Sequence, residues 1–387
     1  MIEIIFQLGM RVAKKRQSRF RSSLYTHEEV IVNIPKRKWA RRRRISAVVC
    51  ALGLVLPFAA QGAIGQASLF GQGRLLGTGA VTAVDGAAGG GINPWAVISG
   101  YGTNQQIGAT AFYSHVLLNN YNMDAYGASL GIFNRIEISY ARQSFSLGNT
   151  GTALDQAINA YAYGLAGVNP SASQLNAPAS QTLGLSGPAF FGNNYQLNQD
   201  IVGLKVRLFG DIVYDQNWWE PQVSVGVDFH HNEMPANLAA TLGVKRNGVS
   251  YYVSATKVWL DGLFGLTTLA NVNLDITNAN QQGLLGFGGV NGMGYKVEPA
   301  ASVGVFLNRH VVLGAEYRSM PQNQLIANAG PLKPLGDAVS KTSAWKDVYV
   351  AWFPYKALSL TAAYVNLGTI ATEKNQSGLY LSLTTSF

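Results

Sequence analysis

The sequence predicts an all-β protein, an antiparallel β-barrel that crosses a membrane. Short segments of alternating apolar and polar residues recur along the chain, and no long apolar run joins them. Only 13% of the residues are charged, against roughly 25% in an average soluble domain. The chain also ends in a strand-like stretch, in which Leu379, Leu381, Leu383 and Phe387 share one face.

The closing stretch, residues 377–387, carries an aromatic side chain on the last residue. A free terminus of a soluble chain usually frays and is polar. This pattern resembles the C-terminal assembly signal of bacterial outer-membrane barrels, with Leu381, Leu383 and Phe387 as the signal residues. It implies that the barrel-assembly machinery is a partner. The alternative is an edge strand of a soluble β-sandwich, whose strands also alternate.

The first 67 residues have the composition of a targeting segment. They hold 13 Lys or Arg and three Asp or Glu, which accounts for the net charge of +9 and removes it as evidence for nucleic-acid binding. A basic region (36–44), an apolar run (45–60) and small residues predict a secretory signal at 36–67. The alternative is a single membrane anchor. Residues 1–35 form an extension outside the fold, and 68–387 form the barrel, exported to the bacterial outer membrane.

Fourteen segments have the length that a tilted strand needs to cross a bilayer. They are 74–85, 93–102, 106–116, 122–132, 134–145, 197–209, 221–231, 249–259, 265–277, 294–307, 309–319, 345–354, 357–367 and 377–387. The first is rich in glycine. If it is not a strand, the alternative is a barrel of twelve strands preceded by a Gly-rich N-terminal arm.

The connections alternate between short and long, which is typical of outer-membrane barrels with short periplasmic turns and long extracellular loops. The longest is 146–196, in which Thr152–Leu165 could form an amphipathic helix. The loop forms either an in-folded constriction or a surface-binding element, or it is a mobile extracellular loop. Aromatic residues gather near the short turns and predict an interfacial belt: Trp218, Trp219, Trp259, Phe264, Phe306, Phe353, Tyr355 and Phe387.

The apolar faces of the strands are expected to meet outer-membrane lipid and the polar faces to line a lumen. The candidate lumen-lining residues are Arg135, Glu137, Lys205, Arg207, Asp228, Asp275, Lys296, Glu298, Glu316 and Arg318. Their charges nearly balance. They could therefore form a field that selects polar solutes, or pair into an ion network that fills the lumen.

Motifs for catalysis, cofactors or metals are weak. The Gly-rich runs lack a following Lys-Ser/Thr and a strand–helix context, which excludes a phosphate loop. Adjacent His230 and His231 would face opposite sides of a strand, which disfavours a shared metal. We therefore expect no enzyme activity, no cofactor and no metal.

A family resemblance appears at residues 73–102, in the runs GRLLGTG (73–79), VDGAAGGG (84–91) and NPWAVISGYG (93–102). It is similar to a proteobacterial family of secreted proteins known only as a domain of unknown function. The likeness extends over most of 70–387. It implies an outer-membrane barrel of undefined role, without agreed catalytic residues.

Three functions remain open. The first is a passive channel or porin for small solutes. The second is a transporter of hydrophobic compounds, with a plug built from residues 71–91 and a lateral outlet. The third is a structural or adhesive surface protein that acts through its long loops. The sequence does not identify a solute.

Overall fold

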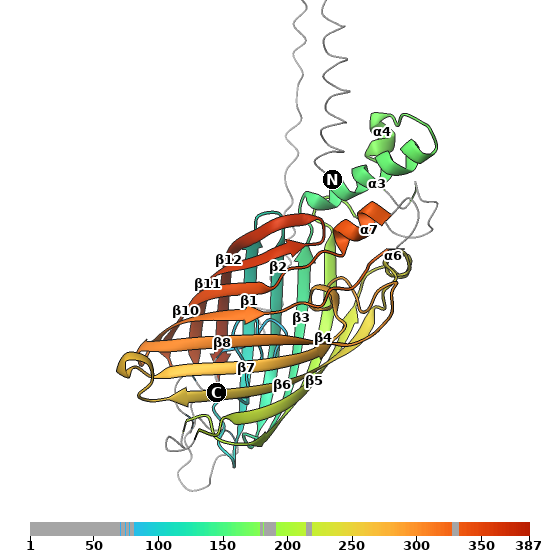
Figure 1. Ribbon diagram of the computed structural model, residues 1–387. Coiled ribbons are helices and arrows are strands. Elements are labelled where there is room, and N and C mark those ends of the chain that lie inside the picture. The colour runs from blue at the N-terminus through green and yellow to red at the C-terminus, as the bar shows by residue number, and fades with distance from the viewer. Residues whose placement is uncertain are drawn as a thin grey trace, which may run out of the picture. The chain divides into compact units, whose positions relative to one another are not determined.

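The chain forms a closed barrel of twelve antiparallel strands, each paired with its neighbours in sequence (Figure 1). The computed structural model describes residues 70, 74, 77, 81–178, 181, 191–213, 219–326 and 333–387. The antiparallel barrel is confirmed, and the twelve-strand alternative is right where fourteen was wrong. The predicted extension at 1–35 and the signal at 36–67 lie outside the described residues.

The strands follow the alternating segments closely. They are β1 (Ile107–Leu118), β2 (Asn122–Ile132), β3 (Ile136–Ser146), β4 (Gln196–Phe209), β5 (Gln222–Asn232), β6 (Asn247–Trp259), β7 (Thr268–Thr277), β8 (Lys296–Asn308), β9 (Val311–Arg318), β10 (Trp345–Tyr355), β11 (Leu358–Ile370) and β12 (Glu373–Ser386). The helical segments are α3 (Thr150–Leu165), α4 (Ala172–Leu175), α6 (Ala236–Leu242), α7 (Lys333–Val339), η2 (Leu263–Gly265) and η3 (Asn280–Gly283).

The barrel closes between its first and last strands. β1 pairs with β12 from Thr110–Ser386 to Leu118–Gly378. Phe387 extends this ladder: its backbone N–H donates to the Ala109 carbonyl at 2.9 Å, and its carbonyl accepts from the Ala109 N–H at 2.7 Å. An unpaired backbone N–H or C=O group in hydrocarbon costs roughly several kcal/mol. Because the seam pairs these groups on the first and last strands, it meets a requirement of any sheet that faces lipid.

The two ends of the barrel differ in their connections. β2–β3, β8–β9 and β10–β11 join by short turns at one end, called here the turn end. The connections that carry α3, α4, α6 and α7 lie at the other, the loop end (Figure 1). The helix expected within 152–165 is present as α3. Among the described residues, no helix has the length and hydropathy needed to cross a bilayer.

The outer face of the barrel is apolar. Along β10, Val348, Val350 and Trp352 are exposed, while Asp347 and Tyr349 are buried inside. The same alternation holds on the other strands, for example on β4 and β7.

Aromatic side chains lie outside near both ends of the strands. Trp219 (83% exposed) and Phe264 (97% exposed) belong to the expected belt at the turn end. Phe353 is buried and faces inward, so its place in that belt was wrong, and Trp218 lies outside the described residues. Exposed tyrosines near the loop end, Tyr251, Tyr295 and Tyr317, were not anticipated. Amphipathic rings at both ends are typical of membrane interfaces.

The two N-terminal segments predicted as strands were 74–85 and 93–102, and their described residues (74, 77, 81–85 and 93–102) are not part of the sheet. Residues 82–102 are all buried within the barrel. Gly86 and Gly100 adopt positive φ angles of 96° and 73°, which bend the chain where a strand would continue. A segment that is buried on every side is rich in apolar residues, as a buried strand is. This similarity in composition explains why the two segments were predicted as strands.

Candidate functional site

Residues 81–102, called here the plug, fill the middle of the barrel. The segment turns back on itself through the bridges Thr82–Ala88 and Gly89–Pro94. A Cβ atom on Gly89 would lie 2.2 Å from the Asn93 carbonyl oxygen, so the tight turn requires glycine there. At its exit the plug reaches the barrel seam, where the Tyr101 N–H donates to the Phe387 carbonyl at 3.3 Å.

The barrel wall holds the plug through its inward polar side chains. The Ala96 N–H donates to Thr256 Oγ1 on β6 at 2.8 Å, and the Ala96 carbonyl accepts from Gln222 and Ser224 on β5. Two strands further along the same side, Trp95 Nε1 donates to Ser302 Oγ on β8 at 3.1 Å. These bonds satisfy plug backbone groups that would otherwise be buried without partners.

One pair of opposite charges, Glu137 on β3 and Lys205 on β4, is fully committed to the plug. Lys205 Nζ lies 3.1 Å from Glu137 Oε1, and both side chains are 1% exposed. The lysine also donates to the Ala88 and Val97 carbonyls, at 2.9 and 3.0 Å. Glu137 accepts from the Ala88 and Ser99 N–H groups, at 3.0 and 2.8 Å. We call these two residues the paired cluster.

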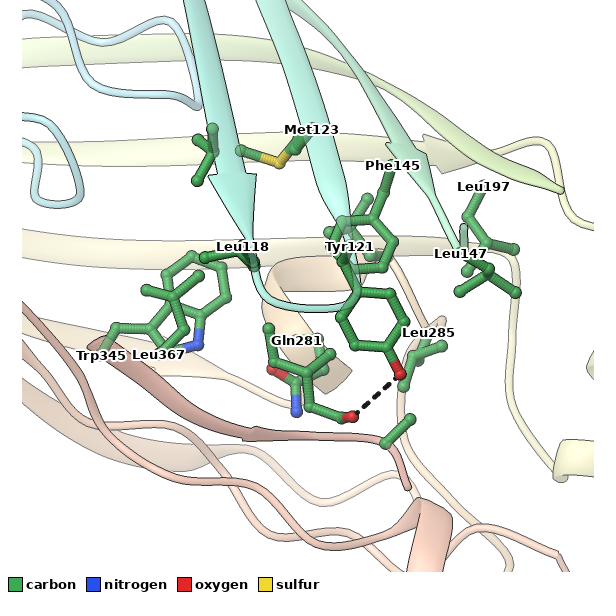
Figure 2. Close-up of a pocket in the computed structure, with 14 residues that line it drawn as sticks. Leu118, Tyr121, Met123, Phe145, Leu147, Leu197, Gln281, Leu285, Trp345 and Leu367 are labelled. Carbon is green, nitrogen blue, oxygen red and sulfur yellow. Dashed lines mark hydrogen bonds between the residues drawn. The ribbon is translucent and has the colours of Figure 1, made fainter. Parts of the chain in front are cut away.

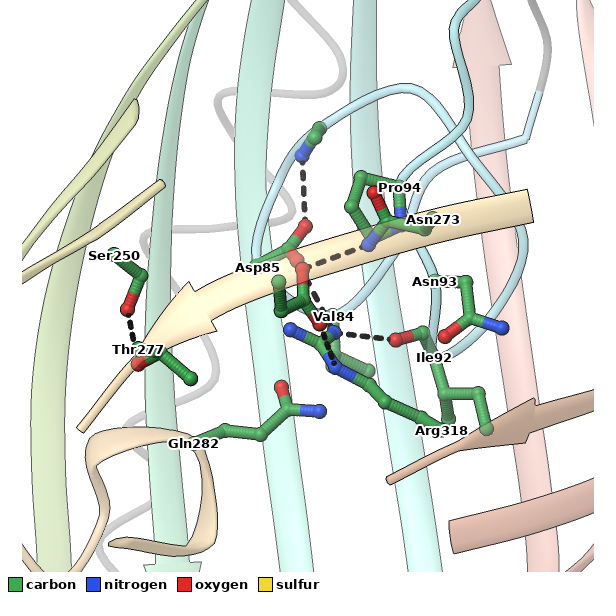
Figure 3. A network of polar contacts seen from close by, with 12 residues as sticks. Val84, Asp85, Ile92, Asn93, Pro94, Ser250, Asn273, Thr277, Gln282 and Arg318 are labelled. Atoms are coloured by element: carbon green, nitrogen blue, oxygen red, sulfur yellow. Dashed lines mark hydrogen bonds and ion pairs between the residues drawn. The ribbon is translucent and has the colours of Figure 1, made fainter. Parts of the chain in front are cut away.

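A second charged cluster surrounds a cavity of about 20 Å³ nearer the loop end. Its charged members are Asp85 of the plug, Asp228 of β5, Asp275 of β7 and Arg318 of β9, with His230 beside them. We call it the acidic chamber. Arg318 Nε lies 3.0 Å from Asp275, and the guanidinium lies 3.7 Å from Asp85 and donates to the Ile92 carbonyl (Figure 3).

The acidic chamber holds more negative than positive charge. Three carboxylates face one guanidinium. Burial raises the pKa of the Asp85 carboxyl above its ordinary value, and Arg318 offsets only part of that effect. Glu316 on β9 and Asp347 on β10 sit directly opposite each other and add further inward carboxylates below.

A different cavity, apolar and also of about 20 Å³, lies at the loop end of β1–β4, β10 and β11. We call it the apolar cavity. Its lining is almost entirely hydrocarbon, and includes Met123, Phe145, Leu197, Leu284 and Trp345 (Figure 2). Tyr121 turns its hydroxyl away to the Ile370 carbonyl, at 3.4 Å. The free volume is close to that of a single water.

The inward-folded segment η3 separates the two cavities. Gln281 lines the apolar cavity, and the next residue, Gln282, lines the acidic chamber. Gln281, Gln282 and Gly283 all have positive φ angles, of 48°, 56° and 93°. Left-handed backbone at two glutamines is strained and is found mainly where the surroundings enforce it. Here Gln199 donates to the Gln282 carbonyl at 2.9 Å, and Asn232 donates to the Gly283 carbonyl at 2.7 Å.

The model of a known family, described as a protein of unknown function (DUF3034), matches residues 78–384. The chain belongs to this DUF3034 family. The match covers the plug and the whole barrel, and it confirms the resemblance seen in the sequence. A comparison with curated proteins finds no match.

Solved structures with a similar fold are distant in sequence from the DUF3034 chain. The KdgM porin is 7% identical with a TM-score of 0.37, over 72% of this chain and 99% of that one. The NanC porin is 11% identical with a TM-score of 0.36, over 72% and 98%. Outer membrane phospholipase of Salmonella typhi is 10% identical with a TM-score of 0.34, over 74% and 91%. With TM-scores this low, the likeness carries no functional conclusion.

The structure places the candidate lumen residues of the DUF3034 chain at several levels. Glu137, Lys205, Asp228, Asp275 and Glu316 are buried inside, and Arg318 is nearly so. Arg207 pairs with Asp211 near the turn end at 3.3 Å. Lys296 and Glu298 lie half-buried near the loop end and bond to Gln322 and Ser319.

Arg135 does not line the lumen, and its prediction was wrong. It lies exposed in the β2–β3 turn, where its guanidinium donates to the Leu208 carbonyl at 3.3 Å. Alternation assigns a face only within a strand, and Arg135 precedes β3 by one residue. Two inward carboxylates were missed. Asp85 fell in a segment assigned to the sheet, and Asp347 lies on β10, whose other inward residues are largely apolar.

The remaining predicted residues concern assembly and metal binding. Leu381 and Leu383 project outward and are exposed, and Phe387 ends the seam. His230 faces inward, whereas His231 faces outward and contacts Asn247 at 2.6 Å. Within the described part of the chain, no group of three or more His, Cys, Asp or Glu side chains has a geometry suited to a metal ion.

Proposed function

We propose that this DUF3034 barrel carries small apolar compounds across the bacterial outer membrane, and that the apolar cavity is where they first bind. The observation that carries the proposal is a hydrocarbon-lined cavity at the loop end, directly above a lumen filled by the plug. Binding sites for small molecules are usually concave and mostly apolar. This corresponds to the plugged transporter among the three functions that the sequence left open.

The filled lumen supports a gated route over a passive pore. Porin-type diffusion needs a water-filled channel. Residues 82–102, in contrast, are buried and hydrogen-bonded to Glu137 on β3 and Glu316 on β9, which lie on opposite sides of the barrel. Passage therefore requires the plug to move. A second candidate, a diffusion channel for small polar solutes, is favoured by the many polar side chains on the inner wall, such as Asn271, Asn273 and Thr256. It would need the plug to leave the lumen.

Membrane placement and assembly belong to the same proposal. The exposed apolar residues of every strand suit contact with lipid, and the seam at Phe387 suits recognition by the barrel-assembly machinery. Deleting Phe387 removes its two backbone bonds to Ala109 and should lower the yield of folded barrel in cells, read as heat-modifiable gel migration. An unchanged yield would remove Phe387 from the assembly signal.

The main test measures ligand binding and conductance on the same preparation. The full chain is placed in nanodiscs of zwitterionic lipid and titrated calorimetrically with benzyl alcohol, using empty nanodiscs as the blank. It is also placed in planar bilayers. We expect saturable binding and no steady single-channel conductance. Because the free cavity is only about one water in size, binding must displace Leu284 or its neighbours.

A matched pair of variants locates the binding. Leu284→Asn places an amide in the apolar cavity and should weaken binding by about tenfold or more, which is about 1.4 kcal/mol. Leu238→Asn makes the same change at an equally buried position on α6 outside the cavity, and should leave binding unchanged. Steady conductance in the unmodified protein, without saturable binding, would instead establish the diffusion channel.

A further inference from the structure

The acidic chamber has more carboxyl groups than cationic groups among the residues that line it. Asp85, Asp228 and Asp275 face Arg318 as the single cation among the residues that line the cavity. The other nearby cation, Lys205, is already paired with Glu137. Buried charge without a partner is unfavourable, so the chamber favours any incoming group that brings positive charge or hydrogen-bond donors.

The chamber also presents polar atoms that have no partner in the part of the chain described. Asp228 Oδ1 and both ring nitrogens of His230 are buried and make no hydrogen bond there. His230 is 8% exposed and Asp228 is 5% exposed. Both side chains line the cavity. Buried polar atoms are nearly always bonded in folded proteins, so these atoms indicate a place for a ligand group.

The guanidinium of the chamber, that of Arg318, is not available to an anion. Arg318 is held between Asp275 and Asp85 and donates to the Ile92 carbonyl at 2.6 Å. A carboxylate entering the cavity would therefore meet three other acidic groups, and the described lining residues include no further cation to offset them. The same position suits an ammonium group, which brings three donors and a positive charge.

The acidic chamber and the apolar cavity are neighbours, because the consecutive residues Gln281 and Gln282 line one cavity each. Gln281 and Gln282 of η3 stand between them, in a strained backbone held by Gln199 and Asn232. A compound with an apolar body and one polar end could occupy both cavities if η3 shifts. The body would then replace Leu284 against Trp345, and the polar end would reach Asp228.

We propose that the acidic chamber is a specificity site for the polar end of the transported compound: it prefers apolar amines, accepts alcohols and rejects carboxylates. The inference rests on the proposed function, since it selects among compounds that the apolar cavity admits. It names the substrate class as small apolar amines. Metal ions are not the expected ligand, because the described carboxylates do not form a metal-binding arrangement.

The test uses three probes that share a phenyl ring and differ in their polar end. Benzylamine, benzyl alcohol and benzoate are titrated calorimetrically into the full chain in zwitterionic nanodiscs at neutral pH, with empty nanodiscs as blanks. We expect benzylamine to bind about tenfold more tightly than benzyl alcohol, and benzoate to bind at least about tenfold more weakly than the alcohol. Competition between benzylamine and benzyl alcohol should show that they share one site.

Asp228→Asn is the decisive variant, because it replaces an acid by an amide of nearly the same size, and Asp228 Oδ1 has no hydrogen-bond partner in the described structure. It should weaken benzylamine by about tenfold and leave benzyl alcohol within about twofold. Asp124→Asn is the matched control: it makes the same change on the outer face, beside His115, and should alter neither probe. His230→Phe keeps the ring packed on Phe287 and provides a second test if Asp228→Asn folds poorly. It should weaken both the amine and the alcohol.

The outcomes separate this inference from the proposed function. If benzyl alcohol binds but the three probes bind equally, or benzoate binds most tightly, the specificity site is wrong and the apolar cavity stands. Retention of the amine preference in folded Asp228→Asn and an unchanged affinity of both probes in His230→Phe would also overturn it. If no probe binds, both proposals fail.

Discussion

The paired cluster and the acidic chamber lie in the same lumen and use the same side chains, yet they are built differently. In the paired cluster, one carboxylate meets one ammonium, and both bond to the plug backbone. In the acidic chamber, three carboxylates share one guanidinium, and Asp228 and His230 keep polar atoms without partners. A buried ion pair whose polar atoms bond to the plug fixes the position of the plug. A buried cluster with unpartnered polar atoms destabilises the fold and is more typical of a ligand site.

The largest expected effect on stability comes from removing the cation of the acidic chamber. Arg318→Met leaves Asp85, Asp228 and Asp275 without the cation of the chamber and removes the bond to the Ile92 carbonyl. We expect a loss of about 5 kcal/mol in the free energy of unfolding, the upper part of the range for breaking a buried ion pair. Urea unfolding in lipid vesicles at neutral pH measures it, with Arg309→Met, an exposed arginine in the β8–β9 turn, as the control.

Removing the cation of the paired cluster should cost less. Lys205→Met leaves Glu137 buried, but the carboxylate keeps its bonds from the Ala88 and Ser99 N–H groups. We expect a loss of about 3 kcal/mol. The double variant Glu137→Gln with Lys205→Met should recover at least half of it, because no unpaired charge remains. A larger loss for Lys205→Met than for Arg318→Met would contradict the distinction between the two clusters.

Replacing one acid by its amide should change the free energy of unfolding in opposite directions in the two clusters. Asp228→Asn replaces a buried carboxyl whose Oδ1 has no partner among the described residues. It should raise the free energy of unfolding by about 1 kcal/mol, the low end of the cost of an unsatisfied buried polar group. Glu137→Gln, which breaks a saturated pair, should lower it. Both are measured by the same urea titration. Loss of stability in both variants would mean that Asp228 has a structural partner.

The smallest effect is the pH dependence that Asp85 contributes. Burial raises the pKa of this carboxyl above its ordinary value of 3.8, so the folded protein holds the proton more tightly than the unfolded chain. Stability from this group is therefore greatest below 3.8 and falls as pH rises toward the folded pKa. Asp85→Asn should flatten the unfolding free energy over that window relative to the unmodified protein. An equal slope in both proteins would show that Asp85 titrates normally.

The sequence predicted best those features that depend on neighbouring residues along the chain. Most strand bounds agree to within a few residues, because lipid on one side and protein on the other enforce alternation along β4, β7 and β10. The same rule failed at Arg135, just outside its strand, and at Phe353, an aromatic residue that packs inside. On β10 and β11 the inner face is partly apolar because it covers the plug rather than water.

The candidate site was the least accessible part of the prediction. Alternation along the strands placed Glu137, Lys205 and Asp228 on an inward face, and Arg318 with them, where the structure has them. The nearly equal numbers of acidic and basic residues did not show that they divide into one neutral pair and one cluster with excess acid. Pairing depends on register across strands far apart in sequence and on a plug segment that carries Asp85. The sequence offered a plug over residues 71–91 as one alternative, and the density of glycines at 86–91 was its signal, since close backbone approach requires them. Its described part, 81–91, lies in the lumen, but the buried segment continues to residue 102.

By itself, the sequence determined a barrel with an apolar exterior and a closing strand at Phe387, because an apolar outer face and a mostly polar inner face impose a period of two that can be read residue by residue. The tertiary structure alone decided that the lumen is filled, that residues 81–102 fill it, and that Asp85, Asp228 and Asp275 meet around Arg318. Those contacts join positions from over forty to over two hundred residues apart, and their free energy depends on which charges become neighbours once water is excluded.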